Sequence, residues 1–306
     1  MASAIITPGN HDGVHLGHQA LVSRAGALAR ERDLASKALF FFPNAAAVLA
    51  PERAPAVLTT PERRAEFLRE AGAEQVEVQP FDRSFAELSP RAFVEQILVQ
   101  RLDCAGLVIG EDFRFGKQRA GDVELLRALG AELHFDVEVL PKLHYAGEAV
   151  SSSRIRSALS AGRVEDACAM LGRLHEVEGV VVRGDARGRA IGFPTANLCT
   201  QGVLLPADGV YAVLMRRVDQ KSAPRLLGVA NLGTRPTFEA GRSTEVHVLD
   251  FDDDLYGARV RVGFAAKLRD ERRFDGVESL VAQLERDVMA GRERLGAVSE
   301  SEARWI

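Results

Sequence analysis

Short apolar runs alternate with helix-length amphipathic segments over the first 140 residues. Strands are predicted at 4–7, 37–42, 74–79, 106–110 and 132–139, and helices at 18–32, 61–71, 89–101 and 122–129. This alternation predicts a doubly wound parallel sheet covered by helices. Leu21, Ala25 and Leu28 recur at helical spacing, and the run 38–42 is apolar throughout, so we assign both segments to the core.

The pattern changes near residue 152. A helical stretch is predicted from Ser152 to Leu171, and after Gly172 short β-rich runs follow one another between Gly, Pro and Asp turns. Five or six antiparallel strands of this kind predict a small barrel. A closing helix from Val277 to about Leu295 would pack an apolar stripe against it, formed by Val277, Leu280, Val281, Leu284 and Val288. We therefore predict domains at 1–158 and 172–306, joined by a helical linker at 159–171.

Composition narrows the classes of function. The chain has 306 residues, 46% of them hydrophobic, and a formal net charge of −4, which argues against an extended nucleic-acid-binding surface. Its three cysteines form no CxxC pair, so neither a disulfide framework nor a zinc knuckle is predicted, and a reducing cytoplasm is expected. The first residues have no signal-peptide pattern, and no apolar run is long enough to span a membrane.

The segment GNHDGVHLGH joins the first predicted strand to a helix expected to begin near His18. A proline and two glycines make the turn permissive, and the N–H groups of a first helical turn attract anions. His15 and His18 flank Gly17, whose missing side chain would leave room for a ligand oxygen. The pattern favours a polyphosphate site of the kind that adenylyl transfer needs.

Two alternatives stay open for this histidine pair. The imidazoles could form a turn pair without a role, or they could be two ligands of a metal ion. A zinc site needs further ligands, however, and the other histidines are scattered with no cysteine pair near them.

A second loop, GEDFRFGKQRAG, follows the apolar run that ends at Gly110. It is not a Walker A loop, because five residues separate its first two glycines and Gln118 stands where a Ser or Thr binds magnesium. Its position after a parallel strand still predicts a ligand loop, with Asp112 as a polar anchor. Phe113 and Phe115 are candidate walls for an aromatic ring, although either could equally pack the core.

Hydroxyl and guanidinium groups gather in VSSSRIRSAL. One serine is explained as a helix N-cap, but Ser152, Ser153 and Arg156 together could direct donors at a polyphosphate.

In the second half, GDARGRAIGFPTANL spaces three glycines four residues apart, a pattern that lets backbone N–H groups approach phosphates but also suits a plain hairpin. Thr195 and Asn197 offer oxygen atoms suited to magnesium. Glu245 lies on a predicted strand and could accept the proton of an attacking alcohol. From spacing alone, a solvated strand residue is the simpler interpretation of Glu245.

Taken in order, these motifs resemble the bacterial family of bifunctional riboflavin kinases and FMN adenylyltransferases, also called FAD synthetases. GNHDGVHLGHQ resembles its first nucleotidyltransferase signature, GEDFRFGKQRAG its flavin-side loop and VSSSRIRSAL its Ser-Ser-Thr-x-Ile-Arg segment. GFPTANL, GVYA, GVANLGTRPTF, EVHVLDF, LYG and KLRDERRF follow the kinase module. HxGH alone would indicate only the wider nucleotidyltransferase superfamily, whereas GFPTANL with GVANLGTRPTF is specific.

The resemblance implies a cytoplasmic enzyme with two activities. The domain at 172–306, riboflavin kinase-like, would phosphorylate riboflavin with ATP to give FMN. The Rossmann-like domain at 1–158 would adenylylate FMN to FAD and release pyrophosphate. Mg²⁺ would serve both reactions, and the partners would be ATP, riboflavin and FMN, with no nucleic acid or membrane. A monomer or weak homo-oligomer is expected.

The resemblance also implies roles for residues. His15 and His18 would stabilise charge on the α-phosphate, with further ATP contacts from Gly9, Asn10, Gly17, Ser152, Ser153 and Arg156, and flavin contacts from Asn44, Asp112, Phe113 and Phe115. In the kinase, Glu245 would be the general base and Arg269 would lie near the flavin phosphate. ATP contacts would come from Gly184, Gly188, Gly192, Pro194, Thr195 and Asn197, of which Thr195 and Asn197 would bind the metal.

The sequence departs from the family pattern mainly in its first half. His11 replaces a usual Phe, Pro8 a bulky apolar residue and Ser153 a Thr, and Ala45 stands where a second proline is usual. An alternative is therefore a riboflavin kinase with an altered amino-terminal domain. A third interpretation is a flavin-binding or regulatory protein without turnover, which the retention of both sets of chemical residues argues against.

Overall fold

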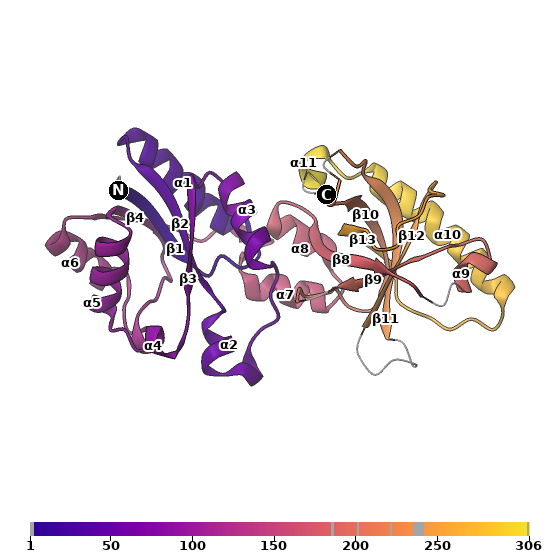
Figure 1. Ribbon diagram of the computed structural model, residues 1–306, viewed down its shortest axis with the longest axis horizontal. Helices are drawn as coiled ribbons and strands as arrows, with labels where there is room; N and C mark the ends of the chain where they lie inside the picture. Colours follow the sequence, from indigo (N-terminus) through magenta and orange to yellow (C-terminus); the bar gives the residue numbers. More distant parts are fainter. Residues whose placement is uncertain (1–2, 185–186, 201, 221, 235–241, 305) are drawn as a thin grey trace. The chain divides into compact units, whose positions relative to one another are not determined.

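The computed structural model describes residues 3–184, 187–200, 202–220, 222–234, 242–304 and 306. The chain forms two compact units, Met1–Ser152 and Ser153–Ile306 (Figure 1), which are described separately. No helix in the described part of the chain is long and apolar enough to cross a membrane.

The first unit is built on a five-stranded parallel sheet. Its strands are β1 (Ala4–Gly9), β2 (Ala35–Phe42), β3 (Gln75–Pro80), β4 (Cys104–Gly110) and β5 (Asp136–Leu140), in the order β3-β2-β1-β4-β5. The chain order reverses at β1, which lies between β2 and β4, so the carboxyl end of β1 is where an open α/β sheet forms its ligand crevice. The predicted doubly wound sheet is confirmed.

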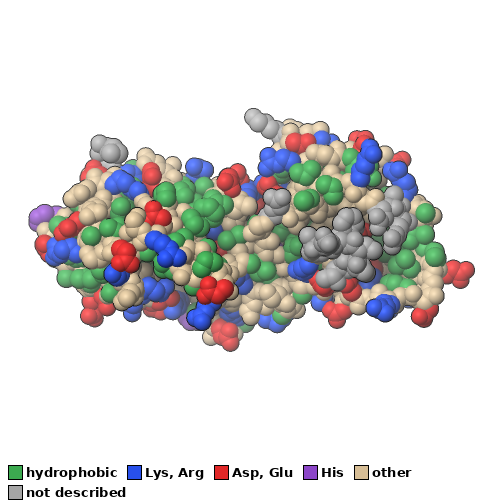
Figure 2. Space-filling view, turned by 60° about the horizontal axis from the view of Figure 1, so that its bottom comes forward, with side chains coloured by type: hydrophobic (Ala, Val, Ile, Leu, Met, Phe, Trp, Pro, Cys, Tyr) green, Lys and Arg blue, Asp and Glu red, His purple; other side chains and the backbone are tan. Residues whose placement is uncertain are grey.

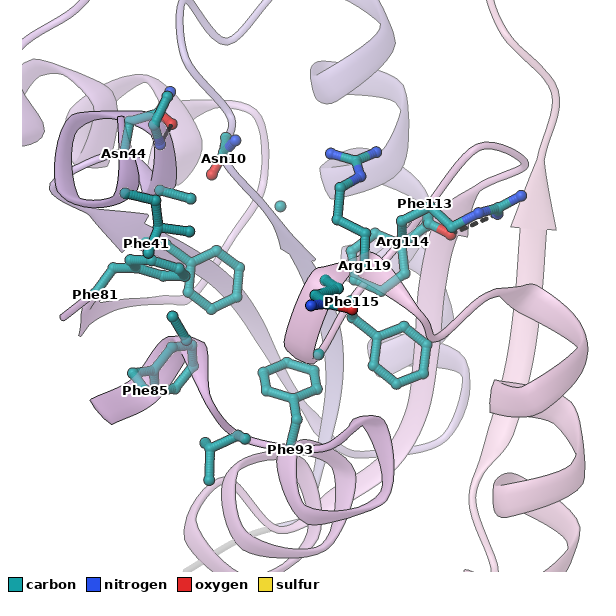
Figure 3. Close-up of a pocket in the computed structure, with 18 of the residues that line it drawn as sticks. Asn10, Phe41, Asn44, Phe81, Phe85, Phe93, Phe113, Arg114, Phe115 and Arg119 are labelled. Atoms are coloured by element: carbon teal, nitrogen blue, oxygen red, sulfur yellow. Dashed lines mark hydrogen bonds between the residues drawn. The ribbon is translucent and has the colours of Figure 1, made fainter. Parts of the chain in front are cut away.

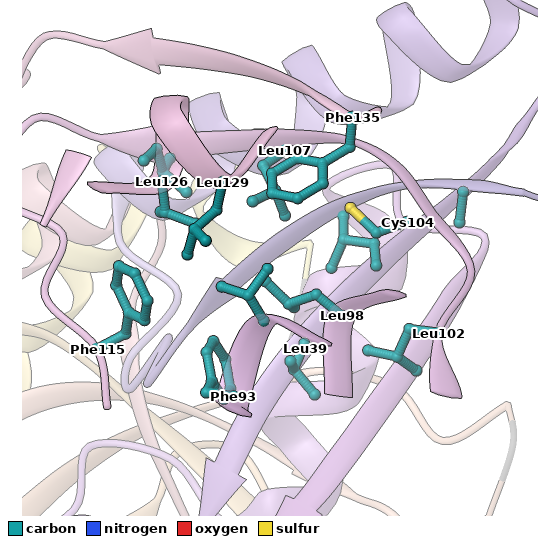
Figure 4. Close-up of a cluster of buried hydrophobic side chains, with 14 residues drawn as sticks. Leu39, Phe93, Leu98, Leu102, Cys104, Leu107, Phe115, Leu126, Leu129 and Phe135 are labelled. Atoms are coloured by element: carbon teal, nitrogen blue, oxygen red, sulfur yellow. The ribbon is translucent and has the colours of Figure 1, made fainter. Parts of the chain in front are cut away.

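Helices connect these strands. They are α1 (Leu16–Glu31), α3 (Pro61–Glu70), α5 (Pro90–Ala92) continued by the π-helix η2 (Phe93–Arg101), and α6 (Val123–Leu133). Local sequence sets their starts: the hydroxyl of Thr60 caps α3 by accepting from the Arg63 N–H, and the carboxylate of Asp122 caps α6. One core cluster of fourteen buried residues packs between the sheet, η2 and α6 (Figure 4).

Most element boundaries in this unit differ from the prediction by a few residues, and two of the differences have a clear local cause. Helix α1 begins at Leu16 rather than near His18, because the His15 side chain acts as its N-cap. The predicted strand at 132–139 is β5 at Asp136–Leu140, since α6 continues to Leu133 and ends at His134 in the left-handed conformation, with φ of 63°.

Short elements complete the first unit. They are α2 (Ala45–Leu49), η1 (Pro51–Arg53), α4 (Arg83–Ala86), η3 (Lys117–Arg119) and the hairpin of β6 (His144–Tyr145) with β7 (Glu148–Ala149). None of these was predicted from the sequence, because each is too short to show a period.

The second unit is a closed antiparallel barrel. Its strands are β8 (His175–Val182), β9 (Ala196–Thr200), β10 (Gly209–Arg217), β11 (Leu226–Thr234), β12 (Arg242–Val248) and β13 (Arg259–Arg269), in the order β10-β11-β12-β9-β8-β13. Along β12, Thr244, Val246 and Val248 are buried inside, whereas Glu245 and His247 are half-buried on the outer face. The barrel prediction is confirmed; of GVANLGTRPTF, the part from 235 onward lies outside the described residues.

Helices flank the barrel strands. The stretch predicted as one helix from Ser152 to Leu171 is two helices, α7 (Ser152–Ser160) and α8 (Val164–Leu171), because Gly162 adopts a positive φ of 75° between them. Two four-residue helices, α9 (Arg187–Ala190) and α11 (Glu300–Ala303), lie in the same unit.

The closing helix α10 (Val277–Gly296) packs on β10, β11 and β13. The predicted stripe is only partly right, since Val277 is 61% exposed at the first turn, while Asp287, Gly291 and Leu295 are buried. Gly291 permits the contact: a Cβ there would lie 2.9 Å from a methyl of Val229.

Charged side chains of both signs are interspersed on the face shown in Figure 2. Some charged side chains pair across elements, as in the bidentate contact of Arg24 on α1 with Glu138 on β5.

Candidate functional site

The two signature histidines lie together at the start of α1. Their rings stack with centroids 3.7 Å apart and planes inclined by 19°. His15 Nδ1 accepts a hydrogen bond of 3.4 Å from the His18 backbone N–H, so the neutral His15 ring carries its proton on Nε2. The space beside Gly17 is bordered by the same ring, since a Cβ there would lie 3.2 Å from it.

The loop between β1 and α1, residues 10–15, is called the histidine loop below. It contains a third imidazole, that of His11, which is buried. The His11 ring stands edge-on to His18 with ring centroids 5.0 Å apart, and its Nε2 lies 3.1 Å from the Thr7 carbonyl oxygen. Burial is the main cause that lowers the pKa of His11 to about 4, and the charge of Arg64 lowers it further, against the raising effect of the Thr7 hydrogen bond. His11 is therefore a neutral ring at neutral pH, close in shape to the phenylalanine it replaces.

An aromatic cavity of about 530 Å³ opens beside this loop (Figure 3). Asn44, Asp112, Phe113 and Phe115, which the sequence singled out for a flavin, all line it, as do Gly9 and Asn10 at the end of β1. Asn44 also caps α2 by accepting from the Ala46 N–H at 3.0 Å, and Asp112 pairs with Lys142 at 3.1 Å.

Sequence reasoning missed most of the cavity wall. Phe41, Phe81, Phe85 and Phe93 line it, and Phe41 contacts the other three rings at centroid distances of 5.8 to 6.5 Å. Assigning the whole run 38–42 to the core was wrong: Leu39 and Phe40 are buried, but Phe41 faces the cavity and Phe42 is 37% exposed. The signal was present in the position of Phe41, near the carboxyl end of a strand beside the switch point.

The serine-rich segment divides between the units. The Ser152 hydroxyl, in the first unit, donates to the Asp12 carbonyl oxygen at 2.8 Å and so ties the end of that unit to the histidine loop. Ser153 and Arg156 lie on α7 in the second unit.

On the barrel, a row of polar side chains crosses three strands. Glu245 on β12 is in register with Asn197 on β9 and with Asn231 on β11. The Thr195 hydroxyl donates to a Glu245 carboxylate oxygen at 3.4 Å, which brings PTAN and the proposed base together. Asn231, which the sequence did not single out, also donates to Glu271 at 3.3 Å.

The glycines before this row serve the protein's own packing. A Cβ on Gly184 would lie 2.1 Å from the Asn197 amide nitrogen, and one on Gly188 would lie 2.2 Å from the Phe193 carbonyl oxygen. Gly192 instead has a φ of 86° with open space around it. The Pro194 carbonyl oxygen lies 2.8 Å from His247 Nδ1, which holds the loop on β12.

Arg269 is held by a buried carboxylate. Its guanidinium forms a fork with Asp287 of α10, with Nη2 to Oδ2 at 2.8 Å and Nε to Oδ1 at 3.0 Å, and its Nη1 donates to the Asp270 carbonyl oxygen. Gln283 donates to the same carboxylate at 2.7 Å. Arg269 is thus fixed at the end of β13.

Among the described residues, no group of three or more His, Cys, Asp and Glu side chains could hold a metal ion.

Comparison with known proteins gives a family match for each half of the chain. The FAD synthetase family model matches residues 1–154, and the riboflavin kinase model matches residues 171–295. The chain is 40% identical over 293 residues to a bifunctional riboflavin kinase/FMN adenylyltransferase of Escherichia coli K12, covering 95% of this chain and 93% of that one. A protein of the same name from Listeria monocytogenes is 38% identical and covers 92% and 90% of the two chains.

A solved structure from Streptococcus pneumoniae, described as a macrolide-efflux protein, has a TM-score of 0.86 to this chain at 31% identity and covers 95% of each chain. The description of that structure differs from the two domain matches and from the names of the relatives. The domain matches and the relatives define the family. Both domains, FAD synthetase and riboflavin kinase, are present on one chain, which favours two activities over the kinase-only alternative. The chain belongs to the family of bifunctional riboflavin kinases/FMN adenylyltransferases.

Proposed function

We propose that the histidine loop and the aromatic cavity of the first unit together form the adenylyltransferase site for FMN and ATP. The observation that carries this proposal is their continuity. Gly9 and Asn10 line the cavity, and they also begin the segment that leads to His15 and to His18 in the first turn of α1. A flavin bound in the cavity would therefore present its phosphate at the loop.

The cavity suits the flavin ring system. The isoalloxazine is flat and aromatic, and six phenylalanines offer faces and edges for offset or edge-to-face contact. A volume of about 530 Å³ is within the range of small-molecule sites. Asn44 and Asp112 supply the polar groups that would orient the ring.

In this reaction an FMN phosphate oxygen attacks the α-phosphorus of ATP, and the bond to the bridging oxygen of pyrophosphate breaks. No covalent enzyme intermediate is needed. His15 donates from Nε2, because its Nδ1 is held by the helix backbone, and His18 acts beside it on the same developing charge. Gly9, Asn10, Gly17 and the first turn of α1 complete the phosphate contacts, together with the Ser152 hydroxyl at the end of the same unit. Roles for Ser153 and Arg156 at the leaving pyrophosphate stay a prediction from the family resemblance.

We propose that the barrel carries the kinase site around Glu245. Its carboxylate accepts the proton of the riboflavin 5′-hydroxyl, and that oxygen attacks the γ-phosphorus of ATP, releasing ADP and forming FMN. The half-buried position of Glu245 beside Thr195 and Asn197 supports this assignment over a solvated strand residue. Gly184, Gly188, Gly192 and Pro194 shape the ATP loop, and Arg269, at the end of β13, lies near the flavin phosphate.

A divalent cation fits the donors of the kinase site, and we propose Mg²⁺. The Thr195 hydroxyl and the Asn197 amide oxygen would hold it together with ATP phosphates. When bound, the metal neutralises phosphate charge during transfer. The residues themselves position the hydroxyl and the base.

We further propose that the enzyme works in the cytoplasm on small-molecule substrates, as a monomer or weak homo-oligomer. Its described cysteines, Cys104, Cys168 and Cys199, are all free thiols, which suits a reducing compartment. We retain 1–158 and 172–306 as the proposed domains, with 159–171 as the linker.

Reciprocal variants test the division of labour. His18→Ala should abolish FAD formation from supplied FMN and leave FMN formation from riboflavin unchanged, whereas Glu245→Gln should do the reverse. Each activity is an internal folding control for the other. Retention of either reaction in the variant meant to remove it would refute that half of the proposal.

A further inference from the structure

The histidine loop holds two side-chain-bearing residues in the left-handed region. His11 has a φ of 48° and Val14 a φ of 40°, on either side of Gly13 at 82°. This conformation is costly for a residue with a Cβ, and most costly for β-branched valine. Such a backbone persists only where its surroundings impose it, and it is common where geometry matters for function. Some contact must therefore hold this loop.

Arg64 on α3 and Asp12 in the loop supply that contact. The guanidinium Nη2 donates to Asp12 Oδ1 at 2.8 Å, and Nη1 donates to the Asn10 carbonyl oxygen at 2.9 Å. One planar guanidinium thus contacts the loop at Asn10 and at Asp12, ahead of His15 and His18. A lysine, with a single ammonium group, cannot reproduce this geometry.

The Asp12 carboxylate is held in turn by the segment before α3. It accepts from the backbone N–H groups of Leu58 and Thr59 at 3.1 and 3.2 Å, and from the Thr59 hydroxyl at 3.2 Å. The Gly13 N–H donates to the Thr59 hydroxyl oxygen, also at 3.2 Å. These contacts fasten the strained turn itself.

The pair is removed from solvent. The side chains of Arg64 and Asp12 are 3% and 4% exposed, and the guanidinium lies 5.1 Å from the centroid of the Phe40 ring in the core. Separating a buried ion pair would leave each charge unpaired in the interior, which is strongly destabilising for the fold. The two side chains therefore hold each other in place. Neither residue lines the aromatic cavity, so neither is placed to touch the flavin.

We propose that Arg64 and Asp12 are positioning residues for adenylyl transfer, which hold the loop from Asn10 to His15 in its strained conformation and thereby set the histidines against the α-phosphate. This inference rests on the proposed adenylyltransferase site. The pair acts on the rate of transfer rather than on flavin affinity, because the cavity walls come mostly from other segments.

Kinetics on the full chain test this. Arg64→Lys keeps the buried charge and loses the two-point grip, and Thr59→Val keeps both charges and removes the hydroxyl that links them. We expect the kcat for FMN adenylylation to fall about 10- to 100-fold in Arg64→Lys and less in Thr59→Val, as for a small misplacement of catalytic groups. FMN affinity, read from flavin fluorescence, should change less than about threefold, the scale of a minor contact.

Two controls accompany these variants. Riboflavin phosphorylation in the same samples should be unchanged, and Arg69→Lys, on the exposed face of the same helix, should behave as wild type. An unchanged kcat in Arg64→Lys would overturn the inference. So would a proportional fall of kcat, FMN affinity and Tm, which would indicate a scaffold role only. Full activity of His18→Ala would instead refute the site on which the inference rests.

Discussion

The His15 ring caps α1 through Nδ1 and stacks on His18 at 3.7 Å, so one side chain serves both the helix and the proposed chemistry. These two roles can be separated, because asparagine is also a strong N-cap but has no imidazole. We expect His15→Asn to keep the Tm of the first unit and to lower FAD formation about 100-fold, as for loss of one oxyanion donor.

The measurement is the rate of FAD formation from FMN and ATP beside a thermal unfolding curve. His144→Asn, at an exposed histidine of the same unit, is the matched control and should change neither. A drop in Tm that accounts for all the lost activity would contradict the separate chemical role.

His11 makes the stability of the first unit depend on pH. Because the folded pKa is about 4 and the ordinary value is 6.5, the unfolded chain binds a proton in this interval that the folded chain does not. Stability contributed by neutral His11 is complete above pH 6.5 and falls as the pH drops towards 4, by roughly 3 kcal/mol in all at 1.36 kcal/mol per pKa unit.

We expect His11→Phe to flatten this acid-side slope and to retain FAD formation, since the neutral ring already behaves as a phenylalanine. Unfolding of wild type and variant between pH 4 and 8 measures the slope. Parallel curves over that range would show that His11 is not the titrating group.

Removing one wall of the aromatic cavity should weaken flavin binding. Phe85 contacts Phe41, Phe81 and Phe93 at centroid distances of 5.5 to 6.2 Å. We expect Phe85→Ala to raise the KM for FMN in adenylylation about tenfold, for an aromatic pair interaction of about 1.4 kcal/mol, with the riboflavin KM of the kinase unchanged. Leu125→Ala, at a partly exposed leucine outside the cavity, is the control. An unchanged KM for FMN would place the flavin elsewhere.

The pair of Arg269 and Asp287 should stabilise the barrel unit. Asp287 is buried, so Asp287→Ala leaves the guanidinium without its carboxylate and should cost about 3 kcal/mol, the low end for a broken buried pair because 19% of the Arg269 side chain is exposed. Calorimetry of the barrel transition measures this. Arg292→Gln breaks an exposed pair with Asp250 and should leave the midpoint temperature of the same unfolding transition unchanged. Equal effects of the two variants would show that burial is not the cause.

The architecture of both units could be predicted from the sequence, because the periodicity of its hydrophobic positions was unambiguous. Alternating helical and apolar segments predicted the parallel sheet, and β-rich runs predicted the barrel. Asp112, Phe113 and Phe115 were predicted from the loop after a parallel strand and Asn44 was implied by the resemblance, and all four line one cavity. Glu245 could be found only by resemblance, since a carboxylate on a strand has no signature of its own.

What the sequence could not show depends on contacts between distant segments. Arg64 and Asp12 are 52 positions apart, and nothing in the chain announces their pairing. Phe41 and Phe40 look alike in an apolar run, yet only Phe41 faces the cavity. Register across the barrel, which brings Asn231 beside Glu245, is likewise a property of the folded chain.

The most direct test of two activities on this chain is a time course with riboflavin, excess ATP and magnesium, in which riboflavin, FMN and FAD are separated by chromatography. We predict that FMN appears first and is then converted to FAD. Accumulation of FMN without FAD, even when FMN is supplied directly, would contradict the assignment of adenylyl transfer to the first unit.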